Sequence, residues 1–275
     1  MKTLNLFETN ECITISKFAG GECHVKLLQE YNEQDAVRIN TRLNSSDDLM
    51  ILMLAVDALR RMQVKRIEAF IPYVPYARQD RVMVPGEPLS IKVFASVINS
   101  LELDKVIVFD AHSDVAPALL NNCMNVPNYE MAAYFLKELK LSGYILVSPD
   151  LGAYKKVDKL AAQIGYKNNI AAGIKVRDLA TGQIIKSDVI ADDLSGKSCI
   201  VVDDICDGGR TFIEIAKSLK EKGAGKLYLV VSHGIFSHNA LDRLKEAGYE
   251  NVCSSNSIAD RTGDGFYKQF NLFEE

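Results

Sequence analysis

The sequence predicts an α/β fold built on parallel sheets. Apolar runs that are typical of buried strands alternate along the chain with amphipathic segments of helical length. Hydrophobic residues make up 48% of the chain and charged residues 25%, as in ordinary globular proteins. With 275 residues, the chain has room for one large domain or two ordinary ones.

Five apolar runs have the length and composition of strands that are buried on both faces of a sheet. They span residues 66–73, 105–112, 144–150, 199–204 and 226–234. Helices are expected between them, over residues 47–63, 89–100, 129–140, 154–164, 211–222 and 238–247. Ser46 or Asp47 fits the first helix start and Ser90 the second, whereas Gly223 and Gly248 fit helix ends.

The two halves of the chain repeat a similar order of helices, strands and charged loops. We therefore expect paired domains, residues 1–127 and 128–275, with residues of both contributing to a site between them. The last residues are the hardest to interpret, but Phe266, Tyr267, Phe270 and Phe273 predict a tail that packs on the body or on a partner.

Charge and cysteine usage exclude several classes of function. The formal net charge of −4 and the isoelectric point near 5.7 give no basis for nucleic acid as the main partner. The first residues do not resemble a signal peptide, and no stretch approaches the length of a membrane span. Six cysteines without CxxC spacing predict reduced thiols and a cytoplasmic location.

The segment Cys199–Phe212 is the most informative stretch, because it joins a buried strand to an acidic, glycine-bearing loop and a helix start. Open parallel sheets bind ligands at the carboxyl ends of their strands. Backbone amides of the loop, at the start of a helix, would form a nest for a phosphate. These loop residues are Asp207, Gly208, Gly209, Arg210 and Thr211.

The adjacent acids Asp203 and Asp204 are within reach of sugar hydroxyls if the loop holds a phosphate. The segment therefore indicates a ribose phosphate, bound by its phosphate at one end and by its ring hydroxyls at the other. The alternative from this motif alone is a strand followed by an acidic turn with no ligand.

Four further motifs make the chain resemble the ribose-phosphate diphosphokinases, also called phosphoribosyl pyrophosphate (PRPP) synthetases. The motifs span residues 18–25, 45–59 with 71–81, 86–98 and 148–161, and the match extends from about Phe18 to Ile258. The sequence PYARQDR, residues 75–81, is the most specific of them. The resemblance implies two type I phosphoribosyltransferase domains, each a mainly parallel sheet flanked by helices.

The resemblance also implies an activity in nucleotide biosynthesis: transfer of the β,γ-diphosphoryl group of ATP to the 1-hydroxyl of ribose 5-phosphate, with release of AMP. By position, Arg78, Gln79 and Asp80 belong to the ATP site, and Phe18 and Glu22 reach the adenine from a neighbouring subunit. A stacked ring and a carboxylate acceptor suit adenine. For Phe18, an ordinary core or interface role is the alternative.

The same resemblance implies a Mg²⁺ cofactor at His112 and Asp150, and catalysis by Lys175 and Arg177. Mg²⁺ binds one or two carboxylates together with substrate phosphates, so His112 is an unusual ligand. Lys175 and Arg177 alternate along an extended segment and therefore point the same way. Two cations there would stabilise the transferring phosphates, under a flap whose tip is residues 178–183.

The chain departs from the family pattern in its phosphate loop, where Gly208 replaces a hydroxyl residue and Arg210 replaces a glycine. Arg210 either compensates on the same phosphate or serves an acceptor with more phosphates, such as the terminal ribose of ADP-ribose. The segment from Gly152 to Lys155 also departs from the family pattern, which usually has a second glycine and an arginine there.

Two other classes remain open: a non-catalytic PRPP-binding subunit and a base-transferring phosphoribosyltransferase. The four residues His112, Asp150, Lys175 and Arg177 argue against the first, and PYARQDR against the second. Shorter outer segments than the family's predict a compact homo-oligomer, a dimer or a multiple of dimers, with simple regulation.

Overall fold

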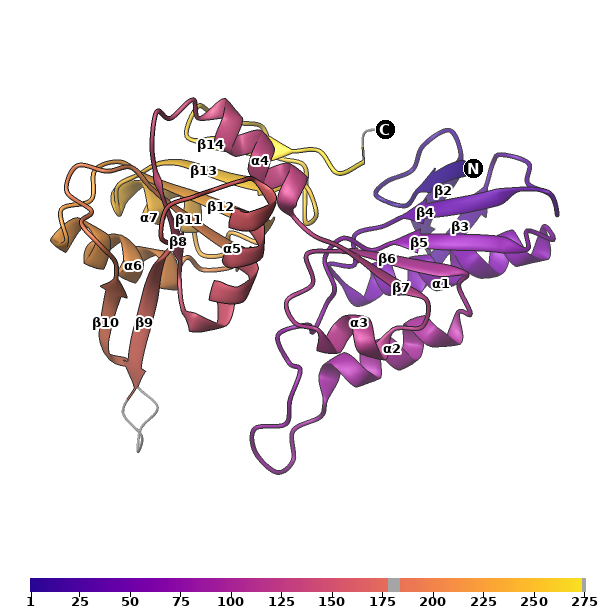
Figure 1. Ribbon diagram of the computed structural model, residues 1–275. Helices are drawn as coiled ribbons and strands as arrows, with labels where there is room; N and C mark the ends of the chain where they lie inside the picture. The colour runs from indigo at the N-terminus through magenta and orange to yellow at the C-terminus, as the bar shows by residue number, and fades with distance from the viewer. Residues whose placement is uncertain (178–183, 274–275) are drawn as a thin grey trace. The chain divides into compact units, whose positions relative to one another are not determined.

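The computed structural model describes residues 1–177 and 184–273. The chain divides into two compact units, Met1–Pro127 and Asn128–Glu275, and each has its own sheet and its own hydrophobic core (Figure 1).

The first unit is built on a five-stranded sheet in the order β1-β4-β5-β6-β7, with every neighbouring pair parallel. Its strands are β1 (Lys2–Asn5), β4 (Ala36–Asn40), β5 (Arg66–Phe70), β6 (Lys105–Phe109) and β7 (Cys123–Val126). The predicted strands at 66–73 and 105–112 are therefore present, each ending a few residues earlier, while β1, β4 and β7 were not predicted.

Helices α1 (Ser46–Arg61), α2 (Ser90–Ser100) and α3 (Val115–Leu119) complete the first unit, with a separate antiparallel hairpin of β2 (Ile13–Lys17) and β3 (Cys23–Leu27). Ser45 caps α1, because its hydroxyl accepts from the Asp48 amide while the Asp48 carboxylate accepts from the Ser45 amide. The buried face of α1 packs into the core of this unit.

The second unit carries a seven-stranded sheet in the order β10-β9-β8-β11-β12-β13-β14, parallel except for the pair β9–β10. Its strands are β8 (Ile145–Ser148), β9 (Ala171–Arg177), β10 (Ile184–Ile190), β11 (Cys199–Cys206), β12 (Leu227–Gly234), β13 (Tyr249–Ser255) and β14 (Tyr267–Phe270). The tail thus becomes an edge strand, with Tyr267 only 3% exposed.

Four helices join these strands: α4 (Tyr129–Glu138), α5 (Leu151–Gln163), α6 (Arg210–Glu221) and α7 (Ala240–Glu246). All four lie within about three residues of the predicted positions. Gly223 and Gly248 follow the ends of α6 and α7 with φ angles of +79° and +90°, which glycine adopts without strain.

The α/β prediction with mainly parallel sheets is confirmed. The six cysteines are unpaired, as their spacing predicts. In the part of the chain that the structure describes, no helix has the length and apolar character needed to cross a bilayer.

Candidate active site

The predicted phosphate loop lies between β11 and α6, at the carboxyl edge of the second sheet. Strand β11 ends at Cys206, and Asp207, Gly208 and Gly209 lead directly into α6 at Arg210. Gly209 adopts a φ of +76° and offers no side chain to cap the helix. The start of α6, whose amides favour anions, therefore faces a loop made mostly of backbone.

The acid pair lies inside β11 rather than after it, because the strand continues two residues beyond Asp204. Asp204 is 6% exposed, and its carboxylate lies 3.5 Å from Nζ of Lys156 on α5. Burial and the neighbouring Asp204 carboxylate raise the pKa of Asp203 well above its usual value. Asp203 therefore binds a proton more readily than an ordinary carboxyl group.

Asp150, which follows the adjacent strand β8 and precedes α5, joins this acidic group. Its carboxylate contributes to the raised pKa of Asp203, so the two groups sense each other. One Asp150 oxygen accepts from the Ala153 amide at 3.1 Å and thereby caps α5. The structure thus brings Asp150, Asp203 and Asp204 to one edge of the sheet.

The predicted catalytic residues Lys175 and Arg177 belong to β9, next to β8. The parallel pairing of these strands ends at Ser148 and Ala172, so the rest of β9 continues past the carboxyl end of β8. There β9 pairs antiparallel with β10 as a two-stranded ribbon. The predicted flap tip, residues 178–183, lies outside the described residues.

In the first unit, Asp80 on the loop after β5 lies within electrostatic reach of His112, which follows β6. Partial burial works against ionisation of Asp80, but a hydrogen bond from Ser113, the Arg81 guanidinium and the charge of His112 together lower its pKa. The Arg81 Nε lies 3.1 Å from an Asp80 oxygen. Asp80 is therefore an ionised acceptor at this edge.

Arg78 and Gln79 precede Asp80 on the same loop, and both are exposed. The Gln79 amide donates to the carbonyl of Tyr76, whose φ of +61° tightens the turn. The motif is thus a structured turn with side chains open to solvent.

Phe18 and Glu22 lie at the tip of the β2–β3 hairpin, far from core packing. Phe18 is 59% exposed, which argues against the core role that the sequence left open. Its ring lies 5.4 Å from that of His24, centroid to centroid. His24 is a ring partner of Phe18 that the sequence did not predict, because their contact depends on the hairpin pairing in which Ser16 lies opposite His24.

The predicted metal ligands His112 and Asp150 belong to different units. Among residues 1–177 and 184–273, no three His, Cys, Asp or Glu side chains lie close enough to hold a metal ion between them.

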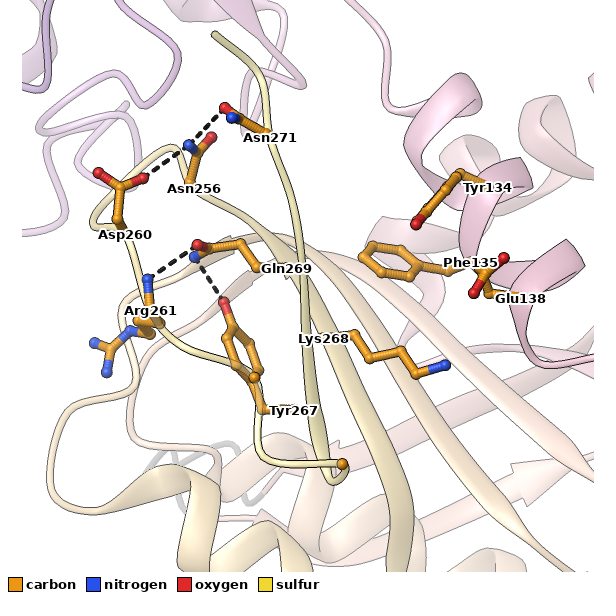
Figure 2. Close-up of a pocket in the computed structure, with 12 residues that line it drawn as sticks. Tyr134, Phe135, Glu138, Asn256, Asp260, Arg261, Tyr267, Lys268, Gln269 and Asn271 are labelled. Carbon is orange, nitrogen blue, oxygen red and sulfur yellow. Dashed lines mark hydrogen bonds between the residues drawn. The ribbon is translucent and has the colours of Figure 1, made fainter. Parts of the chain in front are cut away.

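A pocket of about 530 Å³ lies elsewhere in the second unit, between α4 and the loop and strand that end the chain (Figure 2). Its amides are engaged with neighbours: Asn256 donates to Asp260 and Asn271, and Gln269 donates to the Tyr267 hydroxyl. These bonds indicate a structural role for the pocket wall.

A mainly parallel α/β unit with a glycine-bearing loop after an acid-bearing strand is the arrangement expected of a phosphoribosyltransferase-type domain. Two family models match the chain: the N-terminal domain of ribose phosphate pyrophosphokinase over residues 5–101, and the phosphoribosyl synthetase-associated domain over residues 176–264.

Curated relatives extend the match over most of the chain. A ribose-phosphate pyrophosphokinase of Vibrio parahaemolyticus is 32% identical, over 90% of this chain and 78% of the relative. One of Thermosipho africanus is 30% identical, over 89% of this chain and 78% of the relative. The chain belongs to the ribose-phosphate pyrophosphokinase family, which confirms the resemblance seen in the motifs.

The crystal structure of phosphoribosylpyrophosphate synthetase from Mycobacterium smegmatis shares the fold. It matches with a TM-score of 0.83 over 99% of this chain and 95% of that one, at 24% identity. The expected architecture of two phosphoribosyltransferase-type domains is thereby confirmed.

Proposed function

We propose that this chain transfers the β,γ-diphosphoryl group of ATP to the 1-hydroxyl of ribose 5-phosphate, giving PRPP and AMP. Family membership supports the activity, and one observation supports the site. The loop from Asp207 to Thr211, the acids of β11 and the projecting end of β9 gather at one sheet edge. This edge offers an anion site, hydroxyl acceptors and cationic residues for phosphoryl transfer.

Ribose 5-phosphate is bound, in this proposal, by its phosphate and its ring hydroxyls. Amides of Gly208, Gly209, Arg210 and Thr211 receive the phosphate at the start of α6. The acids then bind the 2- and 3-hydroxyls. Asp204 accepts hydrogen bonds, while Asp203, with its raised pKa, can share a proton in the same contact.

ATP is bound by Arg78, Gln79 and Asp80 of one subunit and by Phe18 and Glu22 of a neighbour. The exposure of the Phe18 ring supports this assignment, because an unpacked aromatic ring at a hairpin tip is available to stack on a base. The enzyme is then a homo-oligomer of the cytoplasm, whose state light scattering after gel filtration would measure. A monomeric chain that is fully active would contradict the shared site.

Mg²⁺ is the proposed cofactor, held by Asp150 and His112 together with phosphate oxygens. The carboxylate of Asp150 at the sheet edge fits an ion that prefers oxygen ligands and keeps water and substrate oxygens. When bound, Mg²⁺ neutralises charge on the ATP phosphates.

Lys175 and Arg177 supply the remaining positive charge. Phosphoryl transfer needs mainly positioning and electrostatic stabilisation, and β9 carries both residues past the edge that holds the acceptor. The names of the relatives favour ribose 5-phosphate over ADP-ribose and favour an enzyme over a regulatory subunit.

Release of AMP from ATP and ribose 5-phosphate tests this proposal. Lys175→Ala should lower kcat by about 100-fold or more while ATP binding, measured by titration calorimetry, changes little. Lys167→Ala is the control, because Lys167 is exposed on a loop of the same unit. A Lys175→Ala enzyme with unchanged kcat would overturn the catalytic assignment.

A further inference from the structure

The segment from Ile235 to Asn239, which connects β12 to α7, lies directly against the proposed phosphate loop. The amides of Ile235 and Phe236 both donate to the Cys206 carbonyl, at 2.9 and 3.1 Å. A Cβ atom built on Gly208 would lie 3.7 Å from the Ser237 Oγ and 4.0 Å from the His238 Cδ2. This connecting segment therefore forms a wall of the loop.

The backbone of the connecting segment is strained on both sides of Ser237. Phe236, His238 and Asn239 have φ angles of +52°, +52° and +53°, in the left-handed region that residues with side chains avoid. A phenylalanine there is a marked outlier. Strained residues of this kind persist where surrounding contacts hold them, and they concentrate at functional sites.

Contacts with Phe236 hold the segment in this conformation. The Phe236 ring packs edge-on against Tyr267 at 5.6 Å, and the Arg261 guanidinium lies 5.5 Å from its centre. Arg261 also donates to the Ile235 carbonyl, and in Figure 2 its side chain extends away from Tyr134. A Cβ atom on Gly234 would lie 2.1 Å from the Phe236 ring, so glycine is required there.

The held segment presents one hydroxyl to the phosphate loop. The Ser237 Oγ donates to Oδ1 of Asp207 at 2.6 Å, across 30 residues of sequence. Asp207 is a negative group in a loop that is to bind an anion, so its charge and orientation affect how strongly the phosphate binds. A hydrogen bond to a carboxylate both spreads its charge and fixes its direction.

We propose that Ser237 is a positioning residue for acceptor binding, which acts by fixing the Asp207 carboxylate so that the loop amides can receive the phosphate. This inference rests on the proposed function of the loop. It makes the strained connecting segment part of the acceptor site, although Ser237 itself touches the loop and not the reacting atoms.

Ser237→Ala tests the role by separating acceptor binding from catalysis. We expect the Kd and KM for ribose 5-phosphate to rise about 10-fold, while kcat and the KM for ATP stay within about twofold. Ser237→Thr keeps the hydroxyl and should stay within about threefold of the unaltered chain. Ser195→Ala, an exposed serine elsewhere in the unit, should change neither constant.

A double-mutant cycle with Asp207→Asn distinguishes positioning from general structural support. If Ser237 acts through the Asp207 charge, adding Ser237→Ala to Asp207→Asn should change the Kd by less than about twofold. The inference is overturned if Ser237→Ala alone leaves the Kd unchanged, or if its effect is equally large in the Asp207→Asn background.

The binding measurement also separates this inference from the proposed function. If the unaltered chain binds ribose 5-phosphate but releases no AMP, the proposed function fails while the Kd values still decide the role of Ser237. If it does not bind ribose 5-phosphate at all, both fail.

Discussion

Asp203→Asn should stabilise the second unit at neutral pH while impairing acceptor binding. Burial and the nearby carboxylates of Asp204 and Asp150 raise the pKa of Asp203, so the folded state holds this proton more tightly than the unfolded state. At pH values between the unfolded pKa near 3.8 and the raised folded pKa, the folded state binds more protons than the unfolded state does. The free energy of unfolding then falls by about 1.4 kcal/mol per pH unit.

The amide in Asp203→Asn cannot ionise, so the variant should lose this slope. Urea unfolding at several values between about pH 5 and 8 should show the variant gaining stability relative to the unaltered chain as pH rises, up to the raised pKa. The same substitution should raise the KM for ribose 5-phosphate, because the amide replaces one carboxylate acceptor. The Asp203 carboxyl group would then lower the stability of the fold while serving acceptor binding.

Asp193→Asn provides a control whose stability relative to the unaltered chain should not change between about pH 5 and 8. Hydrogen bonds from the Ser195 side chain and amide lower the pKa of the exposed Asp193. Its contribution to stability is therefore present at neutral pH and lost as pH falls through the lowered pKa. If the free energies of unfolding of Asp203→Asn and the unaltered chain run parallel between about pH 5 and 8, the account of Asp203 is refuted.

Two further substitutions test packing and charge at the same sheet edge. Gly173→Ala should destabilise the second unit by about 1–3 kcal/mol in thermal unfolding, because its Cβ would lie 2.3 Å from a backbone oxygen. The control Gly143→Ala should leave stability unchanged, because its Cβ would meet no atom within 4 Å. Equal melting temperatures for the two variants would contradict this reasoning. Lys156→Met should lower the free energy of unfolding by about 1 kcal/mol and raise the KM for ribose 5-phosphate several-fold, because Lys156 pairs with the buried Asp204. Lys155→Met, on the same helix, should change neither quantity. A Lys156→Met enzyme that matches Lys155→Met in both measurements would show that the pair has no such role.

The sequence predicts the central strands and the long helices because their apolar runs are buried on both faces and their ends carry ordinary helix signals. Strand β11 and the loop to α6 were predicted within two residues. The hairpin of β2 and β3 was missed because its side chains are mostly half-exposed and its apolar signal is weak. The sequence predicted only a packed tail where β14 lies. Its four residues form a strand because they pair with β13, and the tail's own sequence does not indicate this pairing.

The acid-bearing strand and the glycine-bearing loop could be predicted because their residues lie within one motif. Asp203, Asp204 and Gly209 lie within seven consecutive residues, so one strand and one turn place them together. Lys156 and Ser237 could not be predicted, because their contacts join residues 48 and 30 positions apart and depend on tertiary packing. Such contacts are set by how α5 and the connecting segment lie against β11.

The central claim is the transfer of a diphosphoryl group from ATP to the 1-hydroxyl of ribose 5-phosphate. The most direct measurement is mass spectrometry of the products when ATP and Mg²⁺ are supplied with ribose 5-phosphate and ADP-ribose in equal amounts. We expect AMP and PRPP in a one-to-one ratio, with ADP-ribose unchanged. Diphosphorylated ADP-ribose as the main product, or no AMP at all, would contradict the claim.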